Sequence, residues 1–261
     1  MMNTIRPLKK FGQNYLVDRN ILLKIVDEIN PQKTDALIEI GPGLGVLTNE
    51  LYAKVENLTA VEIDKRVIDD LQVRFPNLVL INQDFLKTDL KPLYEIRKKP
   101  LRFAGNIPYN ITSPIIFKLL ENTAIVEDAV FMVQFEVARR FIAEKGSKDY
   151  GILAVILKYF ASVKLCFKVS PNVFFPRPKV FSAVVHFHFN NERTDQSYNR
   201  LFISIVKAAF GNRRKTLKNS LNNSIFGEIN FENSGIDLSL RAEQLTLENF
   251  ITLTDFVNSK K

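Results

Sequence analysis

Between residues 35 and 189, short apolar runs that fit buried strands alternate with segments of helical periodicity. The first apolar runs are DALIEI (35–40), NLTAVEID (57–64), NLVLINQD (77–84), LRFAG (101–105) and DAVFMVQF (128–135). The segments between them include GVLTNELYAK, KRVIDDLQVRF and SPIIFKLLEN, whose apolar residues recur at helical spacing. Alternation of this kind builds a parallel sheet with helices on both faces. The sequence therefore predicts a doubly wound, Rossmann-like α/β fold.

A polar stretch, NNERTDQSYN (190–199), ends this pattern. We interpret the apolar segments just before it, GILAVILKYFASVKLCFKV and SAVVHFHF (182–189), as the last parts of the sheet domain. The segments after it, LFISIVKAAF and LENFITLTDFV, have helical periodicity. The sequence thus predicts a sheet domain over residues 1–190 and a small helical domain over residues 191–261.

The charge of the chain indicates the class of partner. Lysine and arginine number 36 against 28 acidic residues, for a net charge of +8, which favours a polyanionic partner without establishing one. The segment NRRKTLKNSL (212–221) concentrates Arg213, Arg214, Lys215 and Lys218. These four residues are the candidates for contact with a nucleic acid.

Cysteine content and hydropathy indicate the compartment. The one cysteine, Cys166, cannot form an internal disulfide and is interpreted as a small core residue in a reducing environment. The first residues are basic without an apolar signal region, and no stretch has the length of a membrane span. We expect a cytoplasmic protein.

His186 and His188 alternate on one strand face, but two histidines without a third ligand make a poor metal site, so no metal is expected.

Polar residues follow four of the predicted strands at their carboxyl ends. EIGPGLG (39–45) leaves the first strand and opens a helix, while Glu62, Asp84 and Asn106 end the next strands. Carboxyl ends of neighbouring strands share one crevice in an open α/β sheet, so these residues are expected to converge. Glu39 would repel a pyrophosphate, which argues against a dinucleotide. An acid at the end of the second strand, such as Glu62, can accept both hydroxyls of a ribose.

The ordered segments EIGPGLGVLT, VEID, NQDF and NIPY resemble the motifs of class I S-adenosylmethionine-dependent methyltransferases. FGQNYL (11–16) and FFPRPKVFSAV (174–184) narrow the resemblance, which spans residues 6–221, to the ribosomal RNA adenine dimethyltransferase family. The resemblance implies S-adenosylmethionine as cofactor and a class I methyltransferase sheet. It assigns the cofactor contacts as follows: Asn14 and Leu16 close over it, Gly41 contacts its methionine moiety, Glu62 holds its ribose, and Asp84 with Phe85 holds its adenine.

The segment NIPY (106–109) is suited to holding an adenine amine. The lone pair of that amine is delocalised into the ring, so acceptors for its N–H groups are needed to localise and aim it. Asn106, which is also expected to contact the cofactor, offers an amide oxygen, and the carbonyl of Ile107 or Pro108 offers a second acceptor. Pro108 fixes the turn, and Tyr109 offers a ring on which the base can stack.

No strong general base is required, because the amine becomes acidic once it carries the methyl group. The base lies out of its stack, and a second ring would complete a sandwich with Tyr109. The resemblance places Phe174 there, with Phe175 as the neighbouring alternative. Asn106, Pro108, Tyr109 and Phe174 are thus the predicted catalytic residues.

Three functions stay open at this point. The first is dimethylation of the N6 amines of two adjacent adenosines in the 3′-terminal hairpin loop of small-subunit (16S) rRNA, acting on the 30S subunit or its precursor. The second is the related enzyme that acts on large-subunit rRNA and confers antibiotic resistance. The third is a binding protein that has the fold without catalysis and acts as an RNA-associated or transcription-related factor. Intact NIPY, Glu62 and Asp84 disfavour the third, while GSKDYG (146–151) and FGNRRKTLKNSL (210–221) favour the first.

One residue departs from the family pattern. Phe135 stands where the family more usually has a lysine, so an RNA contact is expected to be missing there. Because the surrounding motif is otherwise recognisable, catalysis is expected to be unaffected.

We expect the protein to be a monomer with a role in small-subunit biogenesis.

Overall fold

The structure is a computed structural model that describes residues 14–260, so residues 11–13 of the FGQNYL motif lie outside the described part. Contacts between residues divide the chain into two units. The first contains residues up to Ala138 together with Lys164–Asn191, and the second contains Arg139–Val163 and Glu192–Lys261. The expected boundary after residue 190 lies beside the end of the first unit, but Arg139–Val163 groups with the C-terminal residues.

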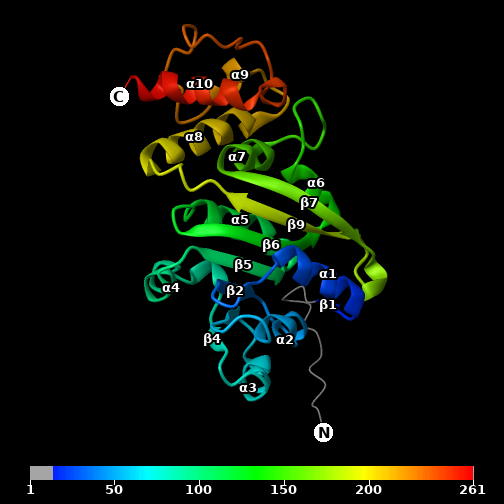
Figure 1. Cartoon of the computed structure of the whole chain (residues 1–261). Helices are drawn as coiled ribbons and strands as arrows, with labels where there is room; N and C mark the ends of the chain where they lie inside the picture. The colour runs from blue at the N-terminus through cyan, green and yellow to red at the C-terminus, as the bar shows by residue number, and fades with distance from the viewer. Residues whose placement is uncertain (1–13, 261) are drawn as a thin grey trace. The chain divides into compact units, whose positions relative to one another are not determined.

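The first unit is built on a mixed sheet whose strand order is β4-β3-β2-β5-β6-β9-β7 (Figure 1). Its parallel strands are β2 (Ala36–Ile40), β3 (Thr59–Glu62), β4 (Val79–Asn82), β5 (Leu101–Asn106) and β6 (Val126–Gln134). β9 (Ser182–Phe189) runs antiparallel to β6, and β7 (Ala161–Val169) completes the sheet. The predicted α/β fold with a parallel sheet is correct for the first five strands.

The antiparallel direction of β9 has a local cause. Between Val169 and Ser182 the chain contains only the short turn η4 (Pro171–Val173) and β8 (Phe174–Phe175). Parallel neighbours are usually joined by a crossover helix, and the connection from β7 to its neighbour β9 contains no such helix. β8 instead pairs with β1 (Tyr15–Leu16) in a small separate sheet.

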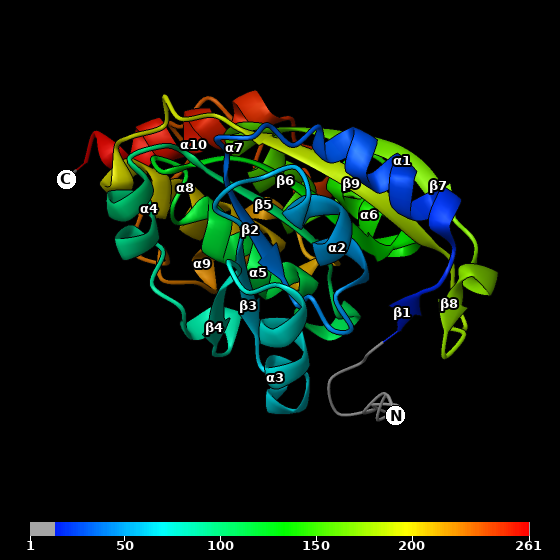
Figure 2. The ribbon, with the colours of Figure 1, turned by 60° about the horizontal axis from the view of Figure 1, so that its bottom comes forward.

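Helices cover both faces of the sheet. The helices of this unit are α1 (Arg19–Ile29), α2 (Val46–Tyr52), α3 (Lys65–Arg74), α4 (Lys91–Arg97), α5 (Thr112–Leu120) and the start of α6 (Phe135–Phe141). α1 and α2 lie side by side (Figure 2), and with α3 they pack apolar residues against Ala104 and Val130 of the sheet. On the opposite face Phe85, in the turn η2 (Phe85–Lys87), contacts Phe103 with 5.8 Å between ring centroids.

Local sequence explains where these helices begin. The Asp18 side chain accepts a hydrogen bond from the Ile21 backbone N–H and caps α1. Asp64 caps α3 in the same way through the Arg66 N–H. Carboxylates at this position satisfy backbone N–H groups that have no partner inside the helix, which typically contributes ~1 kcal/mol. Each cap sets the residue at which its helix begins.

The second unit is helical, as the segments after residue 200 predict. Its elements are α7 (Ile152–Phe160), α8 (Gln196–Ala209), η5 (Phe210–Asn212), α9 (Leu217–Asn222), η6 (Ala242–Gln244) and α10 (Leu247–Asn258). Tyr159 of α7 stacks on Phe202 of α8 with 4.1 Å between ring centroids, which explains why α7 belongs to this unit. Placing residues 151–160 in the sheet domain was wrong, because a short apolar run fits a buried helix as well as a strand.

None of the helices formed by residues 14–260 combines the length and the apolar character needed to cross a bilayer.

Candidate functional site

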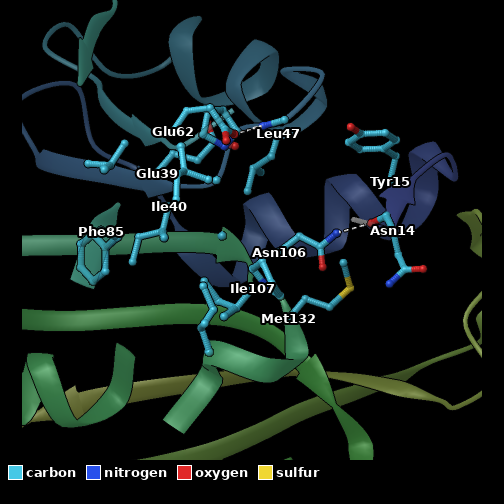
Figure 3. Close-up of a pocket in the computed structure, with 18 of the residues that line it drawn as sticks. Asn14, Tyr15, Glu39, Ile40, Leu47, Glu62, Phe85, Asn106, Ile107 and Met132 are labelled. Atoms are coloured by element: carbon cyan, nitrogen blue, oxygen red, sulfur yellow. Dashed lines mark hydrogen bonds between the residues drawn. The ribbon is translucent and has the colours of Figure 1, made fainter. Parts of the chain in front are cut away.

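The first unit contains a cavity of about 370 Å³ at the carboxyl ends of its parallel strands (Figure 3). A volume of this size falls in the usual range for small-molecule sites. The structure brings to this cavity Asn14, Leu16, Gly41, Glu62, Asp84, Phe85, Asn106, Pro108 and Tyr109. The residues that end separate strands therefore share one crevice, as the strand-end argument expects.

The glycine-rich turn leaves backbone exposed to a ligand. Gly41 has φ +68°, and a Cβ placed there would meet no atom within 4 Å, so its backbone faces open space. Gly43 has φ +53°, and a Cβ there would come within 3.0 Å of the Tyr15 ring. Residues with side chains rarely adopt such angles, so both positions require glycine. The turn is thus shaped for close approach of a ligand to the main chain.

Glu62 is buried and held in one orientation. One of its oxygens, Oε2, accepts the Gly43 backbone N–H at 3.0 Å, and the other, Oε1, accepts the Asp64 N–H at 2.8 Å. Burial raises the pKa of this carboxyl above its usual value, while the two backbone hydrogen bonds act in the opposite direction. Each oxygen keeps a lone pair for a further donor. This arrangement suits a ligand with two adjacent hydroxyl groups.

Two polar atoms in the cavity wall have no hydrogen-bond partner in the described residues. They are the Tyr15 hydroxyl and Oε2 of Glu39. Burial raises the pKa of Glu39 to about 8, so this carboxyl is neutral at pH 7. Buried polar atoms without partners are costly, and a polar ligand in the cavity would satisfy them. Sequence reasoning missed Tyr15, although it lies within FGQNYL, and used Glu39 only against a pyrophosphate.

The side chain of Asn106 is fixed by the segment that precedes α1. Its Nδ2 donates a 2.7 Å hydrogen bond to the Asn14 carbonyl, as Figure 3 shows. Because the amide nitrogen is bound there, the amide oxygen Oδ1 is the acceptor that remains. No donor among residues 14–260 hydrogen-bonds to that oxygen. The cavity therefore holds one oriented, neutral acceptor at the end of β5.

The two backbone carbonyls after Asn106 differ. The Pro108 carbonyl accepts the Ile111 N–H at 3.1 Å and the Thr112 hydroxyl at 3.4 Å, at the start of the turn η3 (Tyr109–Ile111). The Ile107 carbonyl accepts no hydrogen bond from the described residues. The sequence left both open as the second acceptor for an amine. The structure favours Ile107 for that role.

Tyr109 is held at its hydroxyl, which lies 2.9 Å from the Ser182 hydroxyl. Phe174, expected to face Tyr109 across a base, is only 4% exposed and packs in the hydrophobic core with Leu16, its partner across the β1–β8 pair. It does not line the cavity, so stacking would require its ring to leave the core. Phe175, the alternative, is 65% exposed. Alternation along β8 separates these two neighbours, which a motif alone cannot do.

Comparison with known proteins identifies the family. Residues 4–259 match the family described as ribosomal RNA adenine dimethylase. This match covers nearly the whole chain.

The chain belongs to the ribosomal RNA adenine dimethylase family.

Curated relatives support this membership. The chain is 45% identical over 245 residues to the ribosomal RNA small subunit methyltransferase A of Chlorobium phaeobacteroides, covering 94% of this chain and 91% of the relative. It is 41% identical over 263 residues to the protein of the same name from Francisella tularensis subsp. novicida, covering 99% of this chain and 100% of the relative. Both alignments cover at least 94% of the chain.

Solved structures agree with the fold. A dimethyladenosine transferase from Plasmodium falciparum is 26% identical, with a TM-score of 0.77 over 94% of this chain and 98% of that one. The 23S rRNA methyltransferase ErmE is 27% identical, with a TM-score of 0.68 over 94% of this chain and 100% of that one. The predicted class I methyltransferase fold is thereby confirmed. This member of the dimethylase family is a methyltransferase that uses S-adenosylmethionine.

The cavity fits that cofactor. The Glu62 carboxylate offers acceptors for ribose hydroxyls, the open backbone at Gly41 admits close contact, and Glu39 and Tyr15 offer unpaired polar atoms. Phe85 supplies an apolar wall and Asp84 a carboxylate beside it, whose Oδ1 accepts the Leu86 N–H at 2.9 Å. Which part of the cofactor each residue contacts stays a prediction.

The four predicted RNA-binding residues of this dimethylase lie in the second unit and differ in their contacts. Arg213 donates to the Lys148 and Tyr150 carbonyls, each at 3.2 Å, and pairs with Glu243 at 3.4 Å. Lys218 pairs with Glu232 at 3.3 Å. Arg214 and Lys215 are exposed and make no ion pair with the described residues. Arg213 and Lys218 are therefore held by contacts within the protein, whereas the charges of Arg214 and Lys215 are exposed to solvent.

The two histidines also have a partner that the sequence did not reveal. Asp128 lies beside His186 and His188, and ligand atoms of the three fall within 4.8 Å of one another, so the expectation of no third group was wrong. Arg102 donates to both Asp128 oxygens at 2.8 and 2.7 Å, and His186 Nε2 lies 2.9 Å from Oδ2. The guanidinium already neutralises the carboxylate and would repel a divalent cation. We interpret the group as a buried ion pair of the fold.

Proposed function

We propose that the protein transfers methyl groups from S-adenosylmethionine to the N6 amines of two adjacent adenosines in the 3′-terminal hairpin loop of small-subunit (16S) rRNA. Family membership supports adenine dimethylation of ribosomal RNA. The two curated relatives carry the name of the small-subunit enzyme at 45% and 41% identity. The site offers acceptors suited to an amine. A role in small-subunit biogenesis follows if the substrate is the 30S subunit or its precursor.

The observation that carries this proposal is the hydrogen bond from Asn106 Nδ2 to the Asn14 carbonyl, 2.7 Å long. It turns the amide so that Oδ1, an acceptor, is presented to an incoming N–H group. The Ile107 carbonyl is the second free acceptor one residue later. An exocyclic amine has two N–H groups, so the pair matches it in number and type.

The chemistry follows from this arrangement. The cofactor supplies an electrophilic methyl group, and the protein's task is to hold the amine at the correct distance and angle. The Asn106 amide oxygen and the Ile107 carbonyl orient the amine by accepting hydrogen bonds from its two N–H groups, and neither acceptor needs to be charged. The proton is lost after transfer, when the nitrogen carries a positive charge and is acidic. Tyr109, fixed by Ser182, offers a ring face for the adenine.

The alternative substrate is large-subunit rRNA, on which the structural neighbour ErmE acts according to its description as a 23S rRNA methyltransferase. That neighbour is 27% identical to this chain, against 45% and 41% for the small-subunit relatives. We favour the small subunit because of this difference in identity.

The two units have different proposed roles. We propose that residues 1–190, apart from Arg139–Val163, form the catalytic domain, and that residues 191–261 together with Arg139–Val163 form the rRNA-binding domain. The protein acts as a monomer in the cytoplasm and uses no metal. Arg213 and Lys218 stabilise the second unit, while Arg214 and Lys215 contact RNA phosphates.

The test is the methylation state of rRNA in cells that lack this protein. Mass spectrometry of the 3′-terminal hairpin should show two unmodified adenosines, which become dimethylated when the gene is restored. Restoring an Asn106→Ala variant should leave them unmodified. Fully dimethylated adenosines in the deletion strain would contradict the proposal.

A further inference from the structure

Among residues 14–260, the exposed phenylalanines lie in one segment. Phe175 is 65% exposed and Phe181 is 45% exposed, and every other phenylalanine in residues 14–260 is buried or half-buried. Val180, next to Phe181, is 44% exposed. Large exposed apolar side chains that occur together indicate a contact surface rather than core. The segment between β8 and β9 therefore carries apolar surface that packing does not explain.

A lysine ammonium lies over two aromatic rings at this segment. Lys168 Nζ of β7 is 3.9 Å from the Phe181 ring centroid and 4.6 Å from the Phe135 ring centroid. The Phe135 backbone N–H donates to the Phe181 carbonyl at 2.9 Å, which places the two phenylalanines directly opposite each other. We call Phe135, Lys168 and Phe181 the lysine clamp. Phe135 is the residue that stands where the family more usually has a lysine.

The two rings position the Lys168 ammonium group without neutralising its charge. The side chain is exposed, and it makes no ion pair with any carboxylate in the part of the chain that the structure describes. Contact with a ring face attracts a cation without cancelling its charge. A lysine restrained in this way has lost much of its rotamer freedom before any ligand binds, so binding an anion costs less entropy.

The clamp is joined to the cavity wall through neighbours in sequence. Phe181 is followed by Ser182, whose hydroxyl is 2.9 Å from that of Tyr109 in the cavity wall. Phe135 follows Gln134, the residue paired with Ser182 at the end of β6. The clamp thus lies one residue beyond the strand ends that support the proposed base-binding ring. The segment that carries the clamp therefore begins one residue from the contact with Tyr109.

We propose that the lysine clamp binds the single-stranded rRNA next to the target adenosine. Lys168 contacts a backbone phosphate, and Phe181 stacks a flanking base on the face that Lys168 does not cover. Phe135 is a positioning residue that holds the ammonium. A cation beside exposed aromatic rings is the combination that single-stranded nucleic acids bind. This inference rests on the proposed function, because it takes the rRNA around the modified adenosines as the ligand.

The experiment measures binding of the full chain to small ribosomal subunits that lack the two dimethyladenosines, at several salt concentrations. Lys168→Ala should weaken binding about three- to tenfold near physiological salt and lower the log–log salt slope by about 0.7 to 0.9. Phe181→Ala should weaken binding at least about fivefold with an unchanged slope, because stacking is uncharged. Phe181→Tyr, which keeps an aromatic ring at this position, should bind as tightly as wild type. Cofactor affinity, measured by calorimetry, should stay at the wild-type value in all three.

Two further variants separate binding from folding. Lys54, an exposed lysine just after α2, is the matched control, and Lys54→Ala should bind as tightly as wild type. Adding Phe135→Lys to Lys168→Ala returns a positive charge to the clamp and should recover most of the lost affinity and slope. Urea unfolding of each variant shows whether the fold is intact. A loss that follows stability instead of charge would contradict the proposal.

The proposed function and this inference fail separately. If the wild-type protein methylates only large subunits, the proposed function is wrong, and the clamp is tested by the same variants on large subunits. The clamp is overturned if folded Lys168→Ala and Phe181→Ala bind with wild-type affinity and salt slope to the subunit that the wild type methylates. An increase in the KM for subunits at constant kcat would support it, since the clamp holds RNA and takes no part in transfer.

Discussion

The Asn106 amide nitrogen lies 2.7 Å from the carbonyl oxygen of Asn14, which joins the end of β5 to the segment before α1 across 92 residues of sequence. This hydrogen bond has two effects. It orients the amide oxygen as an acceptor, and it ties one wall of the cavity to another. The residue proposed to hold the amine therefore also helps to shape the cofactor site.

Replacing Asn106 tests this double role. Asn106→Ala should abolish methyl transfer, because loss of one positioned group in the transition state typically costs ~2.7–4 kcal/mol. Cofactor affinity should fall much less, since the hydrogen bond to Asn14 is one neutral contact, worth ~0.5–1.5 kcal/mol. A tritium transfer assay beside calorimetry measures both. Asn110→Ala, at an exposed asparagine on the same cavity, is the control and should stay active. Normal turnover by Asn106→Ala would exclude the assigned role.

Glu62 is predicted to act on cofactor binding. Glu62→Ala removes the acceptor proposed for two hydroxyl groups, and hydrogen bonds to charged groups are worth ~1.5–3 kcal/mol each. The dissociation constant for S-adenosylmethionine should rise at least about tenfold. The variant also leaves the Gly43 and Asp64 N–H groups unpaired, so Glu62→Gln, which keeps one acceptor, should show a smaller loss. Glu95→Ala on the exposed surface of α4 controls for charge. An unchanged constant would show that the strand-end assignment is wrong.

Glu39 is predicted to make stability depend on pH. Its pKa is raised from 4.5 to about 8 by burial, so the folded protein holds a proton that the unfolded chain releases. The free energy of unfolding should fall as pH rises from about 4.5 to 8, by at most ~1.36 kcal/mol per pH unit, and this contribution should level off above that range.

The neutral isostere Glu39→Gln removes that titration. Urea unfolding should find it close to wild type at pH 5 and more stable than wild type at pH 8.5. Glu95→Gln should leave the wild-type pH profile unchanged. Parallel pH profiles for wild type and Glu39→Gln would contradict the assignment of a neutral carboxyl.

The basic segment of the second unit is predicted to bind RNA through two residues. Arg214→Glu with Lys215→Glu should weaken binding to small subunits and flatten the salt slope by at least about 1.4 units, since each lost phosphate contact contributes about 0.7 to 0.9. Cofactor affinity should stay constant. Arg213→Ala should instead lower stability, because its guanidinium holds the Lys148 and Tyr150 carbonyls. Wild-type binding by the double variant would remove this segment from the RNA interface.

Much of the fold and the site could be predicted from the sequence because the signals are local. Apolar runs of strand length predicted β2 to β6, and the polar residues that end them predicted where the cavity lies. The helices at 201–210 and 247–257 followed from periodicity. These features depend on spacing along the chain, and spacing is what a sequence contains.

The features that could not be predicted depend on contacts between distant residues. Phe174 and Phe175 are both aromatic in sequence, and only the pairing of β8 with β1 decides which one is buried. The Pro108 carbonyl is taken by Ile111 and Thr112, which a motif does not show. Asp128 reaches His186 only because β6 and β9 are neighbours. In each case tertiary contacts determine which groups remain available.

The most direct test of the account is a competition for methyl groups between purified small and large ribosomal subunits, both taken from cells that lack this protein. The purified chain and labelled S-adenosylmethionine are added, and the modified nucleotides are identified by mass spectrometry. The account predicts two methyl groups on each of two adjacent adenosines in the 3′-terminal hairpin of small-subunit rRNA, with none on large-subunit rRNA. Preferential methylation of large-subunit rRNA would contradict it.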